Sequence, residues 1–303
     1  MLQFLSAANS RFLADVQRTQ QRQTIAEAQI SSGLKVRVAS DDPDHVDVLL
    51  STRAELLNAR QIKSNLDAYK TEVDTAETTL QGAVKSLERI RTLGAQGLSD
   101  ASASNQRPTL AKEVEAVFSE LVSASRASVQ GRYLFSGDTD QAPPYTVDLT
   151  QINGVAPYAG SLTSGRLAEN QNGVRFSIAK TADVIFDSQG PGESVFAAAN
   201  GLRAALAAND TAAIQKFLSD VETASTYLND QLAFYGSSQS RIATAIDDSS
   251  RLQLSLTQQI SEIQDADLPS SILELNQSKL ALDAAFQAHS ALPRKSLFEY
   301  LFG

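Results

Sequence analysis

IKSNLDAYKTEVDTAETTLQGAVKSLERI, residues 62–90, carries apolar side chains at alternating steps of four and three residues. A period of about 3.5 residues sustained over this length is typical of a long helix whose apolar seam faces a partner helix. The stretch therefore predicts a mainly helical fold. The seam positions are Ile62, Leu66, Tyr69, Val73, Ala76, Leu80, Ala83, Leu87 and Ile90.

The same spacing continues beyond a polar turn and returns in the last third of the chain. After residues 99–108, where Pro108 suits a first helical turn, a second helix is predicted to form an antiparallel hairpin with the first. A longer helix is predicted from Ile214 to Ile263. Its seam positions are Ile214, Leu218, Val221, Ser225, Leu228, Leu232, Tyr235, Gln239, Ile242, Ile246, Ser249, Gln253, Leu256, Ile260 and Ile263. The seam of the second helix consists of Leu110, Val114, Val117, Leu121 and Ala124.

The middle of the chain has a different character. Residues 136–200 are rich in Gly, Pro, Asn and Thr, and they contain short runs such as VRFSIAK at 174–180 and ADVIFD at 182–187. Such runs between turn residues are typical of short strands. The segment is therefore predicted to be a small β-rich insertion in a helical scaffold.

We expect a mainly α fold: an elongated antiparallel helical bundle or coiled coil formed by the N- and C-terminal segments, with a small inserted β-rich domain. The expected parts are a core helix and hinge at 1–40, a rod at 41–135, the insertion at 136–200, the second rod segment at 201–265 and a C-terminal core helix at 266–303.

Charge and composition exclude several function classes. The net charge is −9 and the basic residues are scattered, so we expect no nucleic-acid partner. The absence of Cys excludes disulfides, thiolate catalysis and Cys-ligated metals. No stretch approaches the roughly 18 to 20 apolar residues of a membrane span, so no membrane partner is expected. The N-terminus also lacks the basic start and apolar run of a cleaved secretory signal.

Three carboxylates and a histidine gather at Asp41, Asp42, Asp44 and His45, which permits a metal site, an acid/base pair or a turn. The metal interpretation fails in detail, because an EF-hand loop starting at Asp42 would place Arg53 where a Glu is required. No phosphate-binding loop, nucleophile elbow or zinc motif occurs in the sequence. We expect no enzymatic activity, no cofactor, and no catalytic or metal-binding residues.

A hinge between two helices explains the cluster better. Gly33 can end the first helix in the left-handed conformation. Ser40, Asp41 or Asp42 can cap the next helix, and Pro43 fits the first turn of that helix.

Both ends of the chain carry apolar stripes, which predict either docking onto other molecules or packing of the two ends on each other. We favour docking, because the apolar tail SLFEYLFG at 296–303 exceeds what one helix pair can bury. The candidate assembly residues are Phe4, Leu5, Phe12, Leu13, Val16, Ile272, Leu275, Leu282, Phe286, Leu297, Phe298 and Leu301.

Three stretches of the chain carry local motifs that indicate a family. ISSGLKVRVASDDPDHVDV, residues 30–48, is similar to the N-terminal signature of the bacterial flagellin superfamily, and the proline after the acidic pair resembles the hook-associated protein 3 branch. GRYLFSGDTDQAPPY at 131–145 and SLFEYL at 296–301 are similar to motifs of that branch. The resemblance covers residues 1–145 and 210–303.

The resemblance implies a structural subunit at the junction of flagellar hook and filament, outside the cell. It further implies a homo-oligomeric ring, with hook-associated protein 1 on the hook side and flagellin on the filament side. A cytoplasmic chaperone would bind the C-terminal helical region, and the flagellar type III apparatus would export the chain without a cleaved signal. Filament flagellin, of the same fold, and an unrelated coiled-coil interaction protein are the alternatives.

Overall fold

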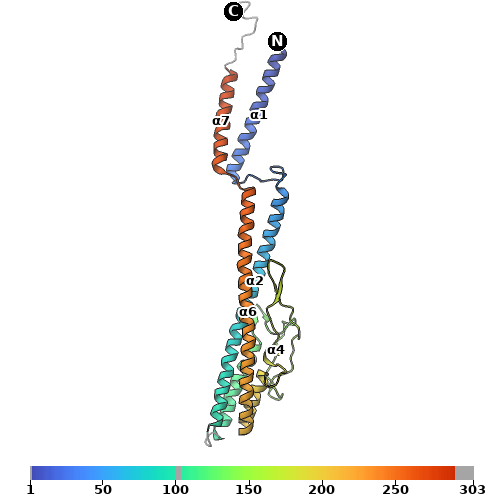
Figure 1. Cartoon of the computed structure of the whole chain (residues 1–303), viewed down its shortest axis with the longest axis vertical. Helices are drawn as coiled ribbons and strands as arrows, with labels where there is room; N and C mark the ends of the chain where they lie inside the picture. Colours follow the sequence, from blue (N-terminus) through green and yellow to red (C-terminus); the bar gives the residue numbers. More distant parts are fainter. Residues whose placement is uncertain (1, 100–103, 291–303) are drawn as a thin grey trace, which may run out of the picture. The chain divides into compact units, whose positions relative to one another are not determined.

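The computed structural model describes residues 2–99 and 104–290, with side chains from residue 9 onward, and it confirms the mainly helical fold (Figure 1). The helices are α1 (Leu2–Ser32), α2 (Val46–Leu98), α3 (Arg107–Ser125), α4 (Ala182–Phe186), α5 (Val195–Ala207), α6 (Thr211–Gln264) and α7 (Leu268–Ser290). The strands are β1 (Ser128–Val129), β2 (Arg132–Tyr133), β3 (Leu167–Glu169) and β4 (Arg175–Ser177).

The chain divides into two compact units. The rod unit comprises residues 58–252, and the end unit combines residues 1–57 with residues 253–303. Helices α2 and α6 each contribute to both units.

The seam predicted along α2 forms the core of the rod unit. Leu66, Leu80, Leu87 and Ile90 are fully buried, while Tyr69 is partly buried against the same core. Helix α3 contributes its predicted seam and also Phe118, which is fully buried. The four-three spacing is therefore confirmed as the pattern that packs these helices.

Helix α6 buries a broader face than its predicted seam. Small and polar residues at Ala224, Gln231, Ser238 and Ala245 are buried beside the expected positions. These four residues form a second buried row on α6, and the insertion packs on it, since Lys180 Nζ donates a hydrogen bond to Gln231 Oε1 at 2.7 Å. Gln and Ser give no apolar signal and Ala gives only a weak one, so the sequence predicts only one of the two packed faces.

The insertion contains less strand than its sequence suggests. Strands β3 and β4 form one antiparallel hairpin in which Ala168 pairs with Phe176. The ADVIFD run, predicted as a strand, is instead helix α4. Ala182, Ile185 and Phe186 are all buried, and their spacing of three and four residues places them on one side of a helical turn.

The insertion shares its core with the rod helices. Phe135 contacts both Phe186 and Tyr235 edge-on, at centroid distances of 5.9 and 6.1 Å. Phe196 of α5 stacks on Phe186 at 5.5 Å and meets Phe118 of α3 at 6.1 Å. The expected boundaries near residues 136 and 200 therefore do not separate compact units, and α5 itself runs across position 200.

Candidate assembly surface and hinge

Helices α1 and α7 pack against each other in the end unit, side by side in Figure 1. Phe12 meets Phe286 edge-on at 6.4 Å between centroids and stacks on His289 at 4.2 Å. Ser271 Oγ donates a hydrogen bond to Gln29 Oε1 at 3.0 Å. Helices α1 and α7 therefore form one antiparallel pair.

Because of this pairing, some candidate assembly residues are buried within the chain and not on its surface. Val16 and Leu282, expected on a surface between molecules, are buried within the chain, because they lie on the faces that α1 and α7 turn to each other. Phe12 and Leu275 are half-buried.

Three other candidates remain exposed. Leu13 is 58%, Ile272 48% and Phe286 51% exposed. Phe4 and Leu5 lie in α1, where their side chains are outside the described part, and Leu297, Phe298 and Leu301 lie outside the described residues.

Exposed large apolar side chains concentrate in the end unit. Among the large apolar side chains on the described parts of α2, α3 and α6 within the rod unit, only Leu98 and Leu252 are exposed. The insertion exposes six more: Val147, Ile152, Leu162, Leu167, Val174 and Val184. A set this dense on one unit is typical of a surface that other molecules cover. The exposed residues of the end unit are Leu13, Ile25, Val38, Val48, Leu50, Leu57, Leu254, Leu268, Ile272, Leu273, Leu280 and Phe286.

Leu50, Leu57, Leu273 and Leu280 are members of this surface that the sequence-based set omits. A signal was present in α2, where two Leu-Leu doublets at 49–50 and 56–57 stand seven residues apart. One leucine of each doublet fills the helix seam, and the other leucine is left without a place in it.

The two connectors at the base of the helix pair are joined by backbone hydrogen bonds. The amides of Lys35 and Val36 donate to the carbonyl of Gln264 at 2.7 and 3.2 Å, and the Ala266 amide donates to Gly33 O at 2.9 Å. Arg53 Nη2 donates to the Gln264 side chain at 2.7 Å. Gln264 is thus the residue that joins the two connectors, and no local sequence pattern predicts this role.

Gly33 ends α1 in the left-handed conformation, with φ of +71° and its amide bonded to Gln29 O at 2.8 Å. Asp41 Oδ2 accepts the amides of Val38 and Arg37 at 3.0 and 2.9 Å. These two hydrogen bonds lower the pKa of Asp41. Asp41 therefore orders the connector and does not cap α2.

Asp42 lies closer to the start of α2. Its carboxylate is 2.9 Å from His45 Nδ1 and 3.8 Å from Lys35 Nζ. The hydrogen bond with the His45 ring, followed by the charges of His45 and Lys35, lowers the pKa of Asp42. Because α2 begins at Val46, Pro43 lies in the preceding turn and not in the first helical turn as expected.

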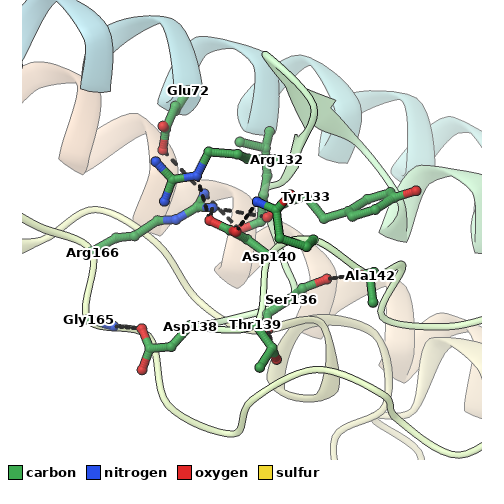
Figure 2. A network of polar contacts seen from close by, with 12 residues as sticks. Glu72, Arg132, Tyr133, Ser136, Asp138, Thr139, Asp140, Ala142, Gly165 and Arg166 are labelled. Carbon is green, nitrogen blue, oxygen red and sulfur yellow. Dashed lines mark hydrogen bonds and ion pairs between the residues drawn. The ribbon is translucent and has the colours of Figure 1, made fainter.

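Figure 2 shows a polar network that fixes the insertion to α2. Arg166 Nη1 is 3.2 Å from Glu72 Oε2, and Arg166 Nη2 is 3.2 Å from Asp140 Oδ2. Arg166 also donates to the carbonyls of Tyr133 and Leu134 at 3.0 and 3.3 Å. Its side chain is only 9% exposed, so it is a charge held inside the protein by these partners.

Arg132 and Asp140 of the GRYLFSGDTD segment complete the network, with Arg132 Nε 2.6 Å from Asp140 Oδ2. Burial of the Asp140 carboxyl acts to raise its pKa, but hydrogen bonds from Gln141 and Arg132 outweigh it and leave the pKa lowered. Asp138 accepts the Gly165 amide at 2.6 Å, which lowers its pKa. The sequence motif thus has a structural role in closing the insertion.

Among residues 2–99 and 104–290, no group of three or more acidic or histidine side chains could hold a metal ion. In the same ranges, no helix combines the length and apolarity needed to cross a membrane.

The rod unit consists of long helices that share a core with an insertion, and in the end unit α1 and α7 form a helix pair with exposed apolar side chains. Together these features define a helical-bundle subunit. The profile of the bacterial flagellin N-terminal helical region matches residues 6–140, and that of the C-terminal helical region matches residues 218–301. These matches cover nearly three quarters of the chain. The chain belongs to the bacterial flagellin family, whose members are structural subunits of the flagellum.

Individual relatives agree with the family. Flagellin B of Helicobacter pylori is 28% identical over 109 residues, which are 36% of this chain and 21% of that protein. The matched part is therefore about a fifth of the length of this curated relative.

The same fold occurs in solved structures of flagellar hook-associated proteins. One from Vibrio parahaemolyticus has a TM-score of 0.65 at 20% identity, covering 74% of this chain and all of the other. FlgL of Bacillus cereus has a TM-score of 0.58 at 20% identity, with 68% and 97% covered. Hook-associated protein 3 of Legionella pneumophila has a TM-score of 0.58 at 15% identity, with 70% and 98% covered.

Proposed function

We propose that the chain is a hook-filament junction subunit, a hook-associated protein 3. The observation that carries the proposal is the fold match over 97–100% of the Vibrio, Bacillus and Legionella chains. The match to Flagellin B, in contrast, is limited to 109 residues.

The end unit supplies the physical basis of assembly. Its exposed apolar side chains would be covered by neighbouring subunits, and a stable contact of this kind buries about 1,000 Å² or more. Such a contact repeated around a homo-oligomeric ring connects many subunits.

The proposed role brings further partners. Hook-associated protein 1 would contact the ring on the hook side and flagellin on the filament side. The chain would be held by a cytoplasmic chaperone at its C-terminal region and exported by the flagellar type III apparatus to the cell exterior, without a cleaved signal. In this role the protein needs no cofactor and catalyses no reaction.

Electron microscopy of a strain that lacks the gene tests the proposal. We expect hooks without filaments and flagellin monomers released into the medium. Filaments of normal length on the deletion strain would refute the junction role.

A filament flagellin is the second candidate, because the curated relatives are flagellins. In that case the deletion strain would also lack filaments, but the medium would contain no other flagellin. Analysis of the shed protein therefore separates the two functions.

A further inference from the structure

The first turns of α2 carry an apolar stripe that stays exposed among residues 2–99 and 104–290. Leu50 and Leu57 are 57% and 64% exposed, whereas the adjacent Leu49 and Leu56 are 5% and 8% exposed. The exposed pair is seven residues apart, so both side chains lie on one face of the helix. The next positions at this spacing are Ser64 and Thr71, so the stripe is confined to the end unit.

Helix α7 carries a second stripe of the same length. Leu273 and Leu280 are 58% and 72% exposed and are also seven residues apart. The face toward α1 contains the buried Ser278 and Leu282. Leu280 is two residues from each of them, which is about 200° around a helix, so the stripe faces away from α1.

The two stripes also match in their polar neighbours. Arg60 follows Leu57 by three residues, and Asp283 follows Leu280 by three residues. In a parallel alignment of the two helices, Leu50 meets Leu273, Leu57 meets Leu280, and Arg60 meets Asp283. Apolar and charged positions then agree in a single register, and the alignment brings no two like charges together.

We propose that the α2 stripe of one copy packs against the α7 stripe of a second copy, with the helices parallel. This inference rests on the proposed function, because it names the contact by which the subunits of the ring associate. The surfaces on the two copies differ, so the contact is head-to-tail, and such contacts close into rings or extend as helices.

Cysteine crosslinking tests the contact directly, because the natural chain contains no Cys. Full-length Leu57→Cys and Leu280→Cys chains are mixed and exposed to a mild oxidant. A disulfide needs the two Cβ atoms about 4 Å apart. We expect a covalent dimer containing one copy of each variant, and the same for Leu50→Cys mixed with Leu273→Cys.

A matched control comes from the same helix. Val48 is 49% exposed and precedes Leu57 by nine residues, about two and a half turns, so it lies on the opposite face. We expect about tenfold less dimer from Val48→Cys with Leu280→Cys, since only a held contact gives thiols a high effective concentration. Equal yields with Val48→Cys would overturn the proposal.

Two other results would also overturn it. Efficient crosslinking of Leu57→Cys with Leu273→Cys, at the expense of the expected pairs, would show that the helices are antiparallel. A disulfide that forms only inside a single chain carrying both Leu57→Cys and Leu280→Cys would show that the stripes meet within one copy.

The charge pair gives an independent check by sedimentation of the full chain. Arg60→Glu is expected to weaken self-association, and Asp283→Arg in the same chain is expected to restore it. Failure of restoration would contradict the register.

Crosslinking in assembled flagella separates this inference from the proposed function. If the cysteine variants restore filaments to the deletion strain but the 57–280 disulfide does not form, only the contact is wrong. If the deletion strain makes normal filaments, the junction role is wrong whatever the crosslinks show.

Discussion

Arg166 and Glu72 are 94 positions apart in the chain, yet Arg166 Nη1 lies 3.2 Å from Glu72 Oε2. Glu72 belongs to α2 and Arg166 precedes β3, so the pair connects the insertion to the rod. Asp140 accepts from the other terminal nitrogen of the guanidinium, at 3.2 Å. One buried side chain therefore fixes two segments of the insertion on α2.

Replacing Arg166 with Met should destabilise the rod unit by about 3 kcal/mol, because it leaves the partly buried Glu72 carboxylate without this partner and removes one of the two arginines that hold Asp140. Arg132, whose side chain is 55% exposed, is the matched control, and Arg132→Ala should cost less than about 1 kcal/mol. Urea unfolding followed by tyrosine fluorescence measures both, since the chain has no Trp. Equal losses for the two variants would show that Arg166 is not the anchor.

Acid should weaken the insertion through Asp140. A carboxyl whose pKa is lowered by folding stabilises the protein above its unfolded pKa of about 3.9, and that contribution is lost as the pH falls through the lowered value. The free energy of unfolding should therefore fall below about pH 4. Asp140→Asn should be less stable at neutral pH but should lose less stability on acidification. Parallel pH profiles for the two proteins would refute the assignment.

Gly33 and Gly82 form a matched pair for testing the hinge. A Cβ at either position meets nothing within 4 Å, but only Gly33 has a positive φ. Gly33→Ala should destabilise the end unit by about 1 kcal/mol, because the left-handed conformation is unfavourable for Ala. Gly82→Ala, inside α2, should stabilise its helix by about 0.5–1 kcal/mol. Circular dichroism during thermal unfolding measures the two shifts, which are expected to have opposite signs.

Tyr235 of α6 supports the insertion through its hydroxyl group. It accepts the Lys180 amide at 3.1 Å and is 1% exposed. Tyr235→Phe leaves this amide without its partner and should cost about 1–3 kcal/mol in urea unfolding. Tyr227→Phe removes a hydroxyl that donates to Val184 O at a more exposed site, and it should cost less. The reverse order would contradict the role of Tyr235.

Hydrogen exchange should distinguish the two units. The buried positions of α7 are Ser271, Ser278 and Leu282, which bury little apolar surface, whereas α2 has a row of fully buried leucines. Amides of α1 and α7 should therefore exchange faster in the free protein than those between Leu66 and Ile90. Protection should rise when the end unit is covered by other subunits. Equal protection of both regions in the free chain would contradict this difference.

The helical seams could be predicted from the sequence because their apolar residues repeat with the period of packed helices. Leu66, Leu80 and Leu87 gave that signal within a single segment, and all are buried. The left-handed conformation of Gly33 at the end of α1 could be predicted for a similar reason, since it depends only on the neighbouring backbone. Local rules are sufficient for features of this kind.

The rest of the site depends on contacts between distant residues. Nothing near Arg166 in the sequence indicates that Glu72 is its partner. Likewise, no pattern around Gln264 indicates that its backbone carbonyl accepts hydrogen bonds from the amides of Lys35 and Val36. The ADVIFD run became a helix because Ile185 and Phe186 entered the aromatic core of the insertion. Tertiary packing decided these positions, and a local pattern does not contain that information.

Immunogold labelling of isolated flagella, with an antibody raised against the purified chain, tests the central claim most directly. A subunit of the junction should be labelled in one narrow band where the hook meets the filament. Gold particles along the whole filament would instead identify a filament subunit, and flagella without any label would contradict a place in the organelle.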